Sequence, residues 1–155
     1  MKTKPPSLSE TIKTEVVCPN DTNPMGLLQG GRLVQWMDIA AAVCAQNHAE
    51  KICVTACIEN VHFKSSARIG DILTIKARIT RAFNTSMEIL VVAHAKNVLS
   101  QKSYLVSEAY FIFVALDDHA HLTAVPSVKP ETTADKQNFR SALLRKKNLR
   151  ENSMG

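Results

Sequence analysis

The sequence predicts an α+β fold in which one long buried helix is wrapped by an antiparallel sheet. Residues 30–48 carry apolar side chains at three- and four-residue steps, which indicates a helix. From residue 52 onward, apolar side chains recur at every second position in several runs, which indicates strands. The chain has 155 residues, a length that suits one compact domain with its own core. A single helix covered by one sheet is the simplest arrangement of these elements.

The helix is expected to begin at the Gly30-Gly31 pair and to be enclosed on nearly all sides. Its apolar face consists of Leu33, Met37, Ala41, Cys44 and His48. The opposite side is hardly more polar, which is typical of a helix without a solvent-facing stripe. Before the helix, residues 11–17 are predicted to form a first strand, and residues 18–26 are dense in turn-forming residues and predicted to be a loop.

Four further strands are expected after the helix, arranged as a meander. They cover residues 52–63, 72–79, 87–95 and 104–116. The run from Tyr110 to Leu116 is apolar throughout, as in a central strand covered on both faces. A polar helix follows from about residue 133 to residue 150, with Phe139 and Leu143 as its expected contacts. The predicted parts of the chain are a flexible arm (1–9), one domain (10–130) and a C-terminal basic helix and tail (131–155).

Charge and composition argue against nucleic acid as a partner. The formal net charge is +5 and the sequence pI is about 9.1, but much of the basic excess lies near the C-terminus. Aromatic residues are only 5% of the chain, which is poor material for stacking on bases. A basic balance instead suits a small anionic ligand.

No targeting or metal-binding pattern is present in the sequence. No apolar run reaches the roughly 18–20 residues that cross a bilayer, and the first residues lack the apolar segment of a signal peptide. We therefore expect a cytoplasmic protein without membrane contact. The four cysteines match no zinc or redox spacing, so we expect no metal site, and we expect reduced, buried thiols.

Asp38 is the residue that most strongly suggests chemistry, because a carboxylate in an apolar helix is unfavourable unless it is paired. Asp38 could accept a proton from water or attack a substrate directly. The backbone N–H of Gly31 could stabilise an oxyanion, and the amide of Asn23 could orient water or a carbonyl. Such a set suits acyl transfer to water. Structural roles are the alternatives: an Asx turn for Asn23 and close helix–sheet packing for the glycines.

The pattern Asn23-x-x-Gly26-x-x-x-Gly30-Gly31-x-x-x-x-x-Met37-Asp38 resembles the signature of the hotdog-fold acyl-CoA thioester hydrolases. This family includes bacterial acyl-CoA thioesterases and the cytosolic and brown-fat-inducible enzymes of animals. Further matching segments are Val54-Thr55-Ala56, Val61-His62-Phe63, Ile69-Gly70-Asp71, Thr85-Ser86-Met87 and the run from Phe111 to Asp117. The resemblance spans roughly residues 10–150.

The resemblance implies the hotdog fold and a dimer whose sheets join edge to edge, assembled further into a hexamer, a trimer of dimers. It also implies hydrolysis of acyl-CoA to free fatty acid and CoA, at a site in the dimer interface and without a metal or cofactor. Asp38 matches the family's general base or nucleophile, Asn23 its companion from the partner subunit, and Gly31 the oxyanion-binding N–H. The implied substrate-binding positions are Gly30, Val54, Thr55, Ala56, Asn84, Thr85 and Ser86.

Three departures from the family pattern bear on substrate binding. Gln29 stands where His or Phe is usual, Phe83-Asn84 where Gly-Arg is usual, and Ser66 where proline is common. They concern CoA affinity and acyl-chain preference. The Phe83-Asn84 departure also keeps open an acyl-CoA-binding or regulatory protein with little turnover. A hydratase-type hotdog enzyme is a further alternative, because Asp21-Thr22-Asn23-Pro24 resembles part of its motif. The motif's histidine is missing, however, since Gly26 stands at its position.

Overall fold

The chain folds into five strands and two long helices, in a computed structural model that describes residues 1–154, with side chains through residue 152. The strands are β1 (Thr11–Val16), β2 (Ile52–Phe63), β3 (Ile72–Ala82), β4 (Ser86–Lys96) and β5 (Ser103–Leu116). The helices are α1 (Gly30–Ala49) and α2 (Thr133–Met154), with short 3-10 helices η1 (Pro6–Leu8) and η2 (Pro19–Asp21). Gly155, the last residue of the predicted tail, lies outside the described residues. The expected elements are confirmed in kind and order, although β3 and α2 are longer than expected.

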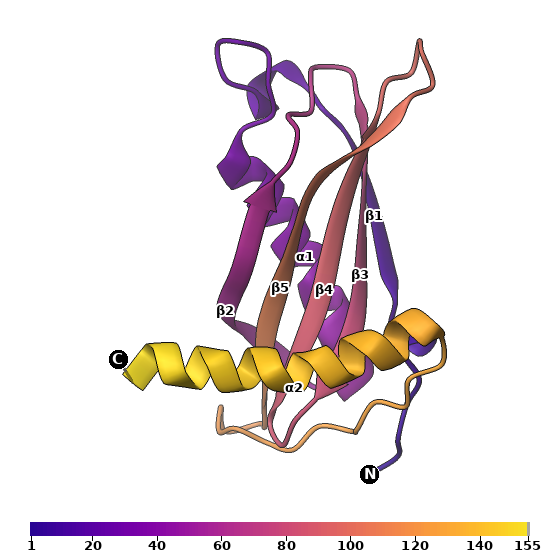
Figure 1. The fold of residues 1–155 in the computed structure, drawn as a ribbon. Coiled ribbons are helices and arrows are strands. Elements are labelled where there is room, and N and C mark those ends of the chain that lie inside the picture. Colours follow the sequence, from indigo (N-terminus) through magenta and orange to yellow (C-terminus); the bar gives the residue numbers. More distant parts are fainter. Residues whose placement is uncertain (155) are drawn as a thin grey trace.

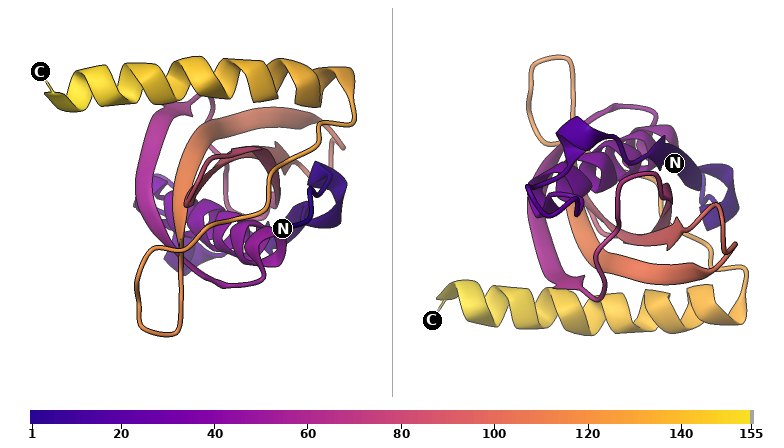
Figure 2. Two further views of the ribbon diagram at one scale, coloured as in Figure 1. Left: turned by 90° about the horizontal axis from the view of Figure 1, so that it is seen from below. Right: turned by 90° about the horizontal axis from the view of Figure 1, so that it is seen from above.

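The strands form one antiparallel sheet in the order β1-β3-β4-β5-β2 (Figure 1). Figure 2 shows the sheet curving around α1, with α2 on its outer side. The predicted meander holds for β3, β4 and β5 but is wrong for β2, which pairs with β5 at the opposite edge from β1. The reason is that residues 64–71 carry the chain across the end of the sheet instead of forming a hairpin. The outer edge of β2 is therefore unpaired in the described chain.

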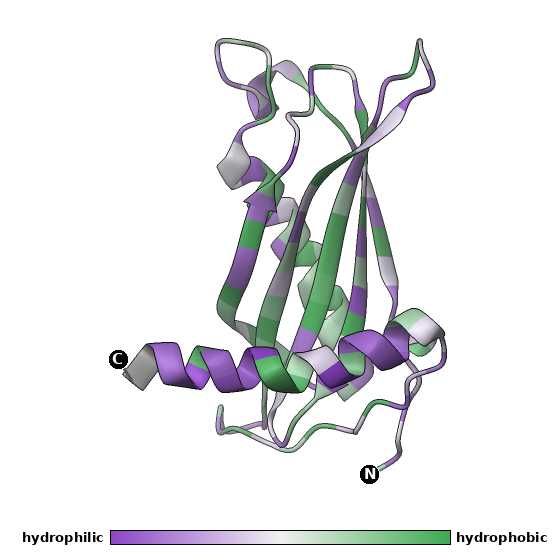
Figure 3. Ribbon diagram, in the orientation of Figure 1, coloured by the Kyte–Doolittle hydropathy of each residue, from purple (hydrophilic) through white to green (hydrophobic). Residues whose placement is uncertain are grey.

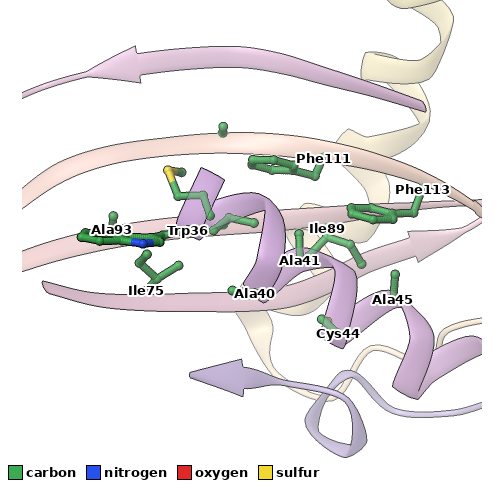
Figure 4. Close-up of a cluster of buried hydrophobic side chains, with 14 of the residues drawn as sticks. Trp36, Ala40, Ala41, Cys44, Ala45, Ile75, Ile89, Ala93, Phe111 and Phe113 are labelled. Atoms are coloured by element: carbon green, nitrogen blue, oxygen red, sulfur yellow. The ribbon is translucent and has the colours of Figure 1, made fainter. Parts of the chain in front are cut away.

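The core lies between the inner face of α1 and the concave face of the sheet. Figure 4 shows Trp36, Ala40, Ala41, Cys44 and Ala45 of α1 facing Ile75, Ile89, Ala93, Phe111 and Phe113 of the strands. Small residues on the helix let it sit close to the sheet, and the strands supply the larger side chains that fill the gap. The expected apolar face of α1 is confirmed, since all five of its predicted members are buried.

The outer face of α1 is open in this chain, so the expectation of a helix enclosed on nearly all sides is wrong for a single copy. Gln35, Ile39 and Val43 are exposed, and Ile39 and Val43 keep more than two fifths of their surface accessible. The sheet has only five strands and covers one side of the helix. A further body of protein is needed to cover the apolar side chains on the other side.

Residues 1–9, expected as a flexible arm, are bound to the rest of the domain. The backbone of Lys4 exchanges hydrogen bonds with Ser127 and Lys129, at 3.0 and 2.9 Å. Its ammonium group donates to the carbonyl of His48 at 2.9 Å and pairs with Glu50 at 2.7 Å. These long-range bonds, which sequence periodicity cannot reveal, hold the N-terminus against the end of α1.

Helix α2 is attached to the outer face of the sheet mainly through charged side chains. It is strongly hydrophilic along most of its length (Figure 3). Arg78 of β3 clamps Asp135 at 2.8 Å, and this hydrogen-bonded guanidinium holds the pKa of the Asp135 carboxyl well below its usual range. The expected contact of Phe139 is confirmed by Arg81, whose guanidinium lies 3.9 Å from its ring centre. The expected contact of Leu143 is wrong, because that side chain is exposed.

Arg145 makes the central attachment of α2. Its guanidinium binds the carboxylate of Glu88 at 2.7 and 3.0 Å and stacks on Tyr110. Glu88 is only 3% exposed, so Arg145→Leu would leave a buried carboxylate without its cation and with only the Thr80 hydroxyl, at 2.6 Å, as a side-chain partner. We expect Arg145→Leu to lower the free energy of unfolding by about 3 kcal/mol. Glu88→Leu/Arg145→Leu should lose less, because neither charge remains; urea unfolding at one fixed protein concentration measures both.

Neither helix combines the length and the hydropathy that a membrane-spanning helix requires, within residues 1–154.

Candidate active site

Asp38 lies on α1 where the helix passes behind β2. Its Oδ1 accepts a hydrogen bond from the Thr55 hydroxyl at 2.7 Å. The carboxylate is half-buried at the border of the open helix face, so the expected enclosure is again wrong in a single chain. Thr55 was expected only as a substrate-lining residue, and its bond to Asp38 was missed. This bond fixes one carboxylate oxygen and leaves Oδ2 for another group.

The strand segment beside Asp38 is irregular and exposed. Val54, Thr55 and Ala56 are all exposed, and the pairing of β2 with β5 shifts register between Thr55 and Cys57. Bulges of this kind bend a strand and redirect side chains, and they are frequent next to active sites. The expected substrate-binding strand is thus placed beside the predicted catalytic carboxylate.

The start of α1 presents free backbone donors at the surface. The first bond of the helix runs from the Leu33 N–H to the Gln29 carbonyl, so the N–H groups of residues 30–32 lie outside the helical ladder. Gly31 is exposed, and a Cβ there would meet nothing within 4 Å. Its N–H is therefore accessible to a ligand, with the positive end of the helix dipole behind it.

Asn23 forms an Asx turn in the loop before α1. Its Oδ1 accepts the N–H groups of Met25 and Leu27 at 2.9 and 3.2 Å. The structural alternative for Asn23 is therefore present, and it is compatible with a further role. Its Nδ2 amino group has no hydrogen-bond partner within residues 1–152, so the side chain can still donate to a ligand.

The predicted catalytic residues fall into two groups within one chain. Asp38 and Thr55 form one group, whereas Asn23 lies in the loop before α1 and Gly31 lies in the first turn of the helix. Gly31 and Asp38 are seven residues apart, which corresponds to about 10 Å along the helix axis. That separation is too large for both to contact one reacting carbonyl.

The loop at residues 84–86 lies apart from Asp38. It joins β3 to the start of β4, near α2. Its carbonyls are used within the fold, since Asn84 accepts from Val125 and Thr85 from Ala115. Ser86 is in register with Val114 of β5, and Val114 with Val54 of β2. The loop therefore stands two strands away from the Val54–Ala56 segment. A cavity of about 240 Å³ lies between Ser86 and residues of α2. At its edge, the ammonium group of Lys146 lies 3.8 Å from the centre of the Phe83 ring.

Exposed apolar side chains surround Asp38 and Thr55. We call this surface the α1–β2 face; it consists of Ile39 and Val43 of α1 and Ile52, Val54 and Phe63 of β2. It is continuous with the unpaired edge of β2. An apolar surface beside a free strand edge is characteristic of an interface with another chain.

The thiols offer little alternative chemistry. All four cysteines are free. Burial raises the pKa of the Cys44, Cys53 and Cys57 thiols to about 11, which disfavours the nucleophilic thiolate. The expectation of buried thiols is confirmed for Cys44 and Cys53, whereas Cys57 is only half-buried and Cys18 is exposed. Within the described residues, no three His, Cys, Asp or Glu side chains are grouped to hold a metal ion.

A sheet curved around one central helix is the hotdog arrangement. Comparison with known proteins agrees with this fold. Residues 25–100 match the thioesterase superfamily model. A Bacillus subtilis protein named as an uncharacterised acyl-CoA thioester hydrolase is 32% identical over 124 residues, which cover 80% of this chain and 72% of that protein. An apo-hexameric acyl-CoA thioesterase superposes with a TM-score of 0.96 at 37% identity, covering 99% of this chain and 98% of the other. The chain belongs to the thioesterase superfamily.

Two mammalian relatives are larger proteins. The acetyl-coenzyme A thioesterase of Mus musculus is 38% identical over 106 residues, 68% of this chain. The cytosolic acyl coenzyme A thioester hydrolase of Homo sapiens is 34% identical over 135 residues, 86% of this chain. The chain spans only 19% and 36% of the lengths of these two proteins.

An acyl-CoA hydrolase from Staphylococcus aureus has been solved in complex with butyryl coenzyme A, coenzyme A and coenzyme A disulfide. It superposes with a TM-score of 0.90 at 35% identity, covering 98% of this chain and 94% of the other. Solved structures of the same hydrolase include alanine variants of one aspartate, one asparagine and one threonine.

Proposed function

We propose that this protein hydrolyses acyl-CoA thioesters to free fatty acid and CoA. The observation that carries the proposal is the Asp38 carboxylate, which Thr55 holds at 2.7 Å on an open apolar face beside a free strand edge. The relatives that bear acyl-CoA thioesterase names support the substrate class. So does the hydrolase from Staphylococcus aureus, which was solved with butyryl coenzyme A.

The active site is composed of two chains. Because Gly31 and Asp38 are about 10 Å apart along one helix, the oxyanion donor and the base at one carbonyl must come from different copies. Two copies joined through the β2 edges would cover both α1–β2 faces. In such a dimer, Asp38 and Thr55 of one chain face Asn23 and Gly31 of the other. Twofold symmetry then gives two equivalent sites.

In each site, Oδ2 of Asp38 takes a proton from water, because Thr55 occupies Oδ1. The resulting hydroxide attacks the thioester carbonyl carbon, and the Gly31 N–H stabilises the oxyanion. The Nδ2 group of Asn23 donates to the water or the carbonyl and orients it. The C–S bond then breaks, and CoA leaves as a thiol that takes up the proton. Direct attack by the carboxylate is the alternative first step. Neither route requires a metal or a redox cofactor.

The variants of the Staphylococcus aureus hydrolase support the choice of residues. Its aspartate, asparagine and threonine variants occur at the same spacing along the sequence as Asp38, Asn23 and Thr55 in this chain. Thr55 acts here as a positioning residue, since it touches Asp38 and not the reacting carbonyl.

The remaining parts of the proposal concern CoA binding, assembly and location. The exposed segment Val54–Ala56 would line the CoA groove, with Gly30 at its helix end. The loop Asn84–Ser86, in which Asn84 is exposed and the other two residues are half-buried, would also line it. A hexamer is supported by the relatives solved as hexamers, and a cytoplasmic location by the cytosolic human relative.

Release of free thiol tests the proposed activity. The purified protein is mixed with acyl-CoAs from acetyl to palmitoyl, and CoA is detected with a thiol reagent. We expect release that is proportional to enzyme concentration for at least one chain length. Tight binding of acyl-CoA by calorimetry, with no release at any chain length, would instead favour the acyl-CoA-binding protein.

A further inference from the structure

We propose that an apolar cavity at the start of α1, closed at its inner end by Val106, receives the acyl chain and sets the chain-length preference. The proposal rests on the thioesterase function and adds a specificity-determining residue to it. The cavity has a volume of about 200 Å³. Most of its lining is apolar or small, and two serines complete it: Leu28, Gly30, Leu33, Phe63, Ala67 and Val106, with Ser65 and Ser66.

The cavity begins where the reacting carbonyl is expected. Gly30 lines it, and Gly31 is the next residue, with an accessible N–H. A thioester whose carbonyl oxygen binds the Gly31 N–H therefore places the first carbons of its acyl chain at the cavity mouth. The ring of Phe63 lies 3.5 Å from the position of a Cβ on Gly30, so this ring and the helix start form the two sides of the mouth.

The inner end of the cavity is set by an irregularity in β5. Pairing between β4 and β5 shifts register between Ala93 and His94, and this leaves Val106 without a partner in the ladder. Side chains of a regular strand alternate between faces, yet Val106 and its neighbour Ser107 are both buried. The bulge therefore turns Val106 toward the core, where it is 1% exposed.

The same bulge holds the loop that follows β2, which lines the cavity at Ser65. The carbonyl of Val106 accepts the N–H groups of Lys64 and Ser65, at 2.8 and 3.4 Å. The hydroxyl of Ser107 donates to the carbonyl of His62 at 2.7 Å. These bonds hold the end of β2 and the following loop against β5, so the cavity is built by the fold and is not a gap between mobile loops.

The size of the cavity limits the chain that it can hold. Sites for drug-sized ligands usually have volumes of about 300–1,000 Å³, so this cavity suits a short acyl chain. Each methylene that enters an apolar pocket improves transition-state binding by about fourfold. We therefore expect kcat/KM to rise with chain length until the chain reaches Val106, and to stop rising there.

Two substitutions at Val106 should move this limit in opposite directions. Val106→Ala deepens the cavity, so the optimum should shift to a longer chain. Val106→Ile shortens it, so the optimum should shift to a shorter chain, with at least a fourfold loss for the longest substrate that the wild type accepts. The measurement is kcat/KM for thiol release across saturated acyl-CoAs of increasing length.

Val91 provides the matched control, since it is equally buried on β4 but does not line the cavity. Val91→Ala and Val91→Ile should change rates for all chain lengths by one common factor.

The proposal is overturned if the two Val106 variants leave the chain-length profile unchanged, or if both shift it in the same direction. If the wild type releases no thiol at all, the proposed function fails. The same variants are then compared by acyl-CoA affinity, whose chain-length profile supports or overturns the cavity assignment separately.

Discussion

Asp38→Asn is expected to lower kcat for thioester hydrolysis by about 10²–10⁴-fold, the usual contribution of a general base. The asparagine amide has nearly the shape of the carboxylate, and its oxygen can still accept the Thr55 hydroxyl bond at Oδ1. What it loses is the basic oxygen that takes the proton from water. The KM should therefore change little, because CoA binding depends on other segments. Thiol release under saturating acyl-CoA measures the loss directly.

Two further variants make the Asp38 result specific. Thr55→Val removes the hydroxyl that orients the carboxylate, so we expect a smaller loss of kcat than in Asp38→Asn. Asp118→Asn is the control, because Asp118 is an exposed carboxylate in the connection between β5 and α2; its kcat should equal that of the wild type. Wild-type turnover in Asp38→Asn would contradict the role of Asp38 as base or nucleophile.

The elements of the fold were predictable because each has a local signal. The apolar steps of three and four residues place α1, and the alternation in residues 52–63 places β2 with its observed bounds. The position of β2 in the sheet was not predictable, because it depends on the path of residues 64–71 across the sheet end. The charged part of the attachment of α2 was missed for a similar reason, although the contact of Phe139 was predicted. It depends on ion pairs with Arg78 and Glu88, far apart in sequence, and not on an apolar stripe.

The open face of α1 shows why interface and core look alike in a sequence. Ile39 and Val43 are residue types that are usually found in a core, yet both are exposed in a single chain. Periodicity indicates that an apolar side chain is shielded from water. It does not indicate whether the same chain or a partner chain shields it. The same limit applies to the site: Asp38 and Asn23 were found from residue type and resemblance. Their assignment to two different chains came from the resemblance, and the rise of about 10 Å along the helix between Gly31 and Asp38 supports it.

Activity is expected to return when two inactive variants are combined in one dimer. Asn23→Asp keeps the oxygen that accepts the Met25 and Leu27 N–H groups, so the loop should remain folded, but it removes the Nδ2 donor. Asn23→Asp and Asp38→Asn chains should each be almost inactive alone. In a mixed dimer, the unaltered Asn23 of one chain meets the unaltered Asp38 of the other. One native site is thereby restored.

Random re-association of equal amounts of the two variants should recover about a quarter of wild-type activity, because half of the dimers are mixed and each carries one native site of two. Wild-type chains mixed equally with chains carrying both substitutions provide the matched control. If the site is shared between chains, that mixture should also retain about a quarter of the activity, because only dimers of two wild-type chains keep native sites. If each chain carried a complete site, the control would retain about half and the first mixture would recover nothing. The two mixtures together thus distinguish a shared site from a self-contained one, whatever the absolute rate of the enzyme.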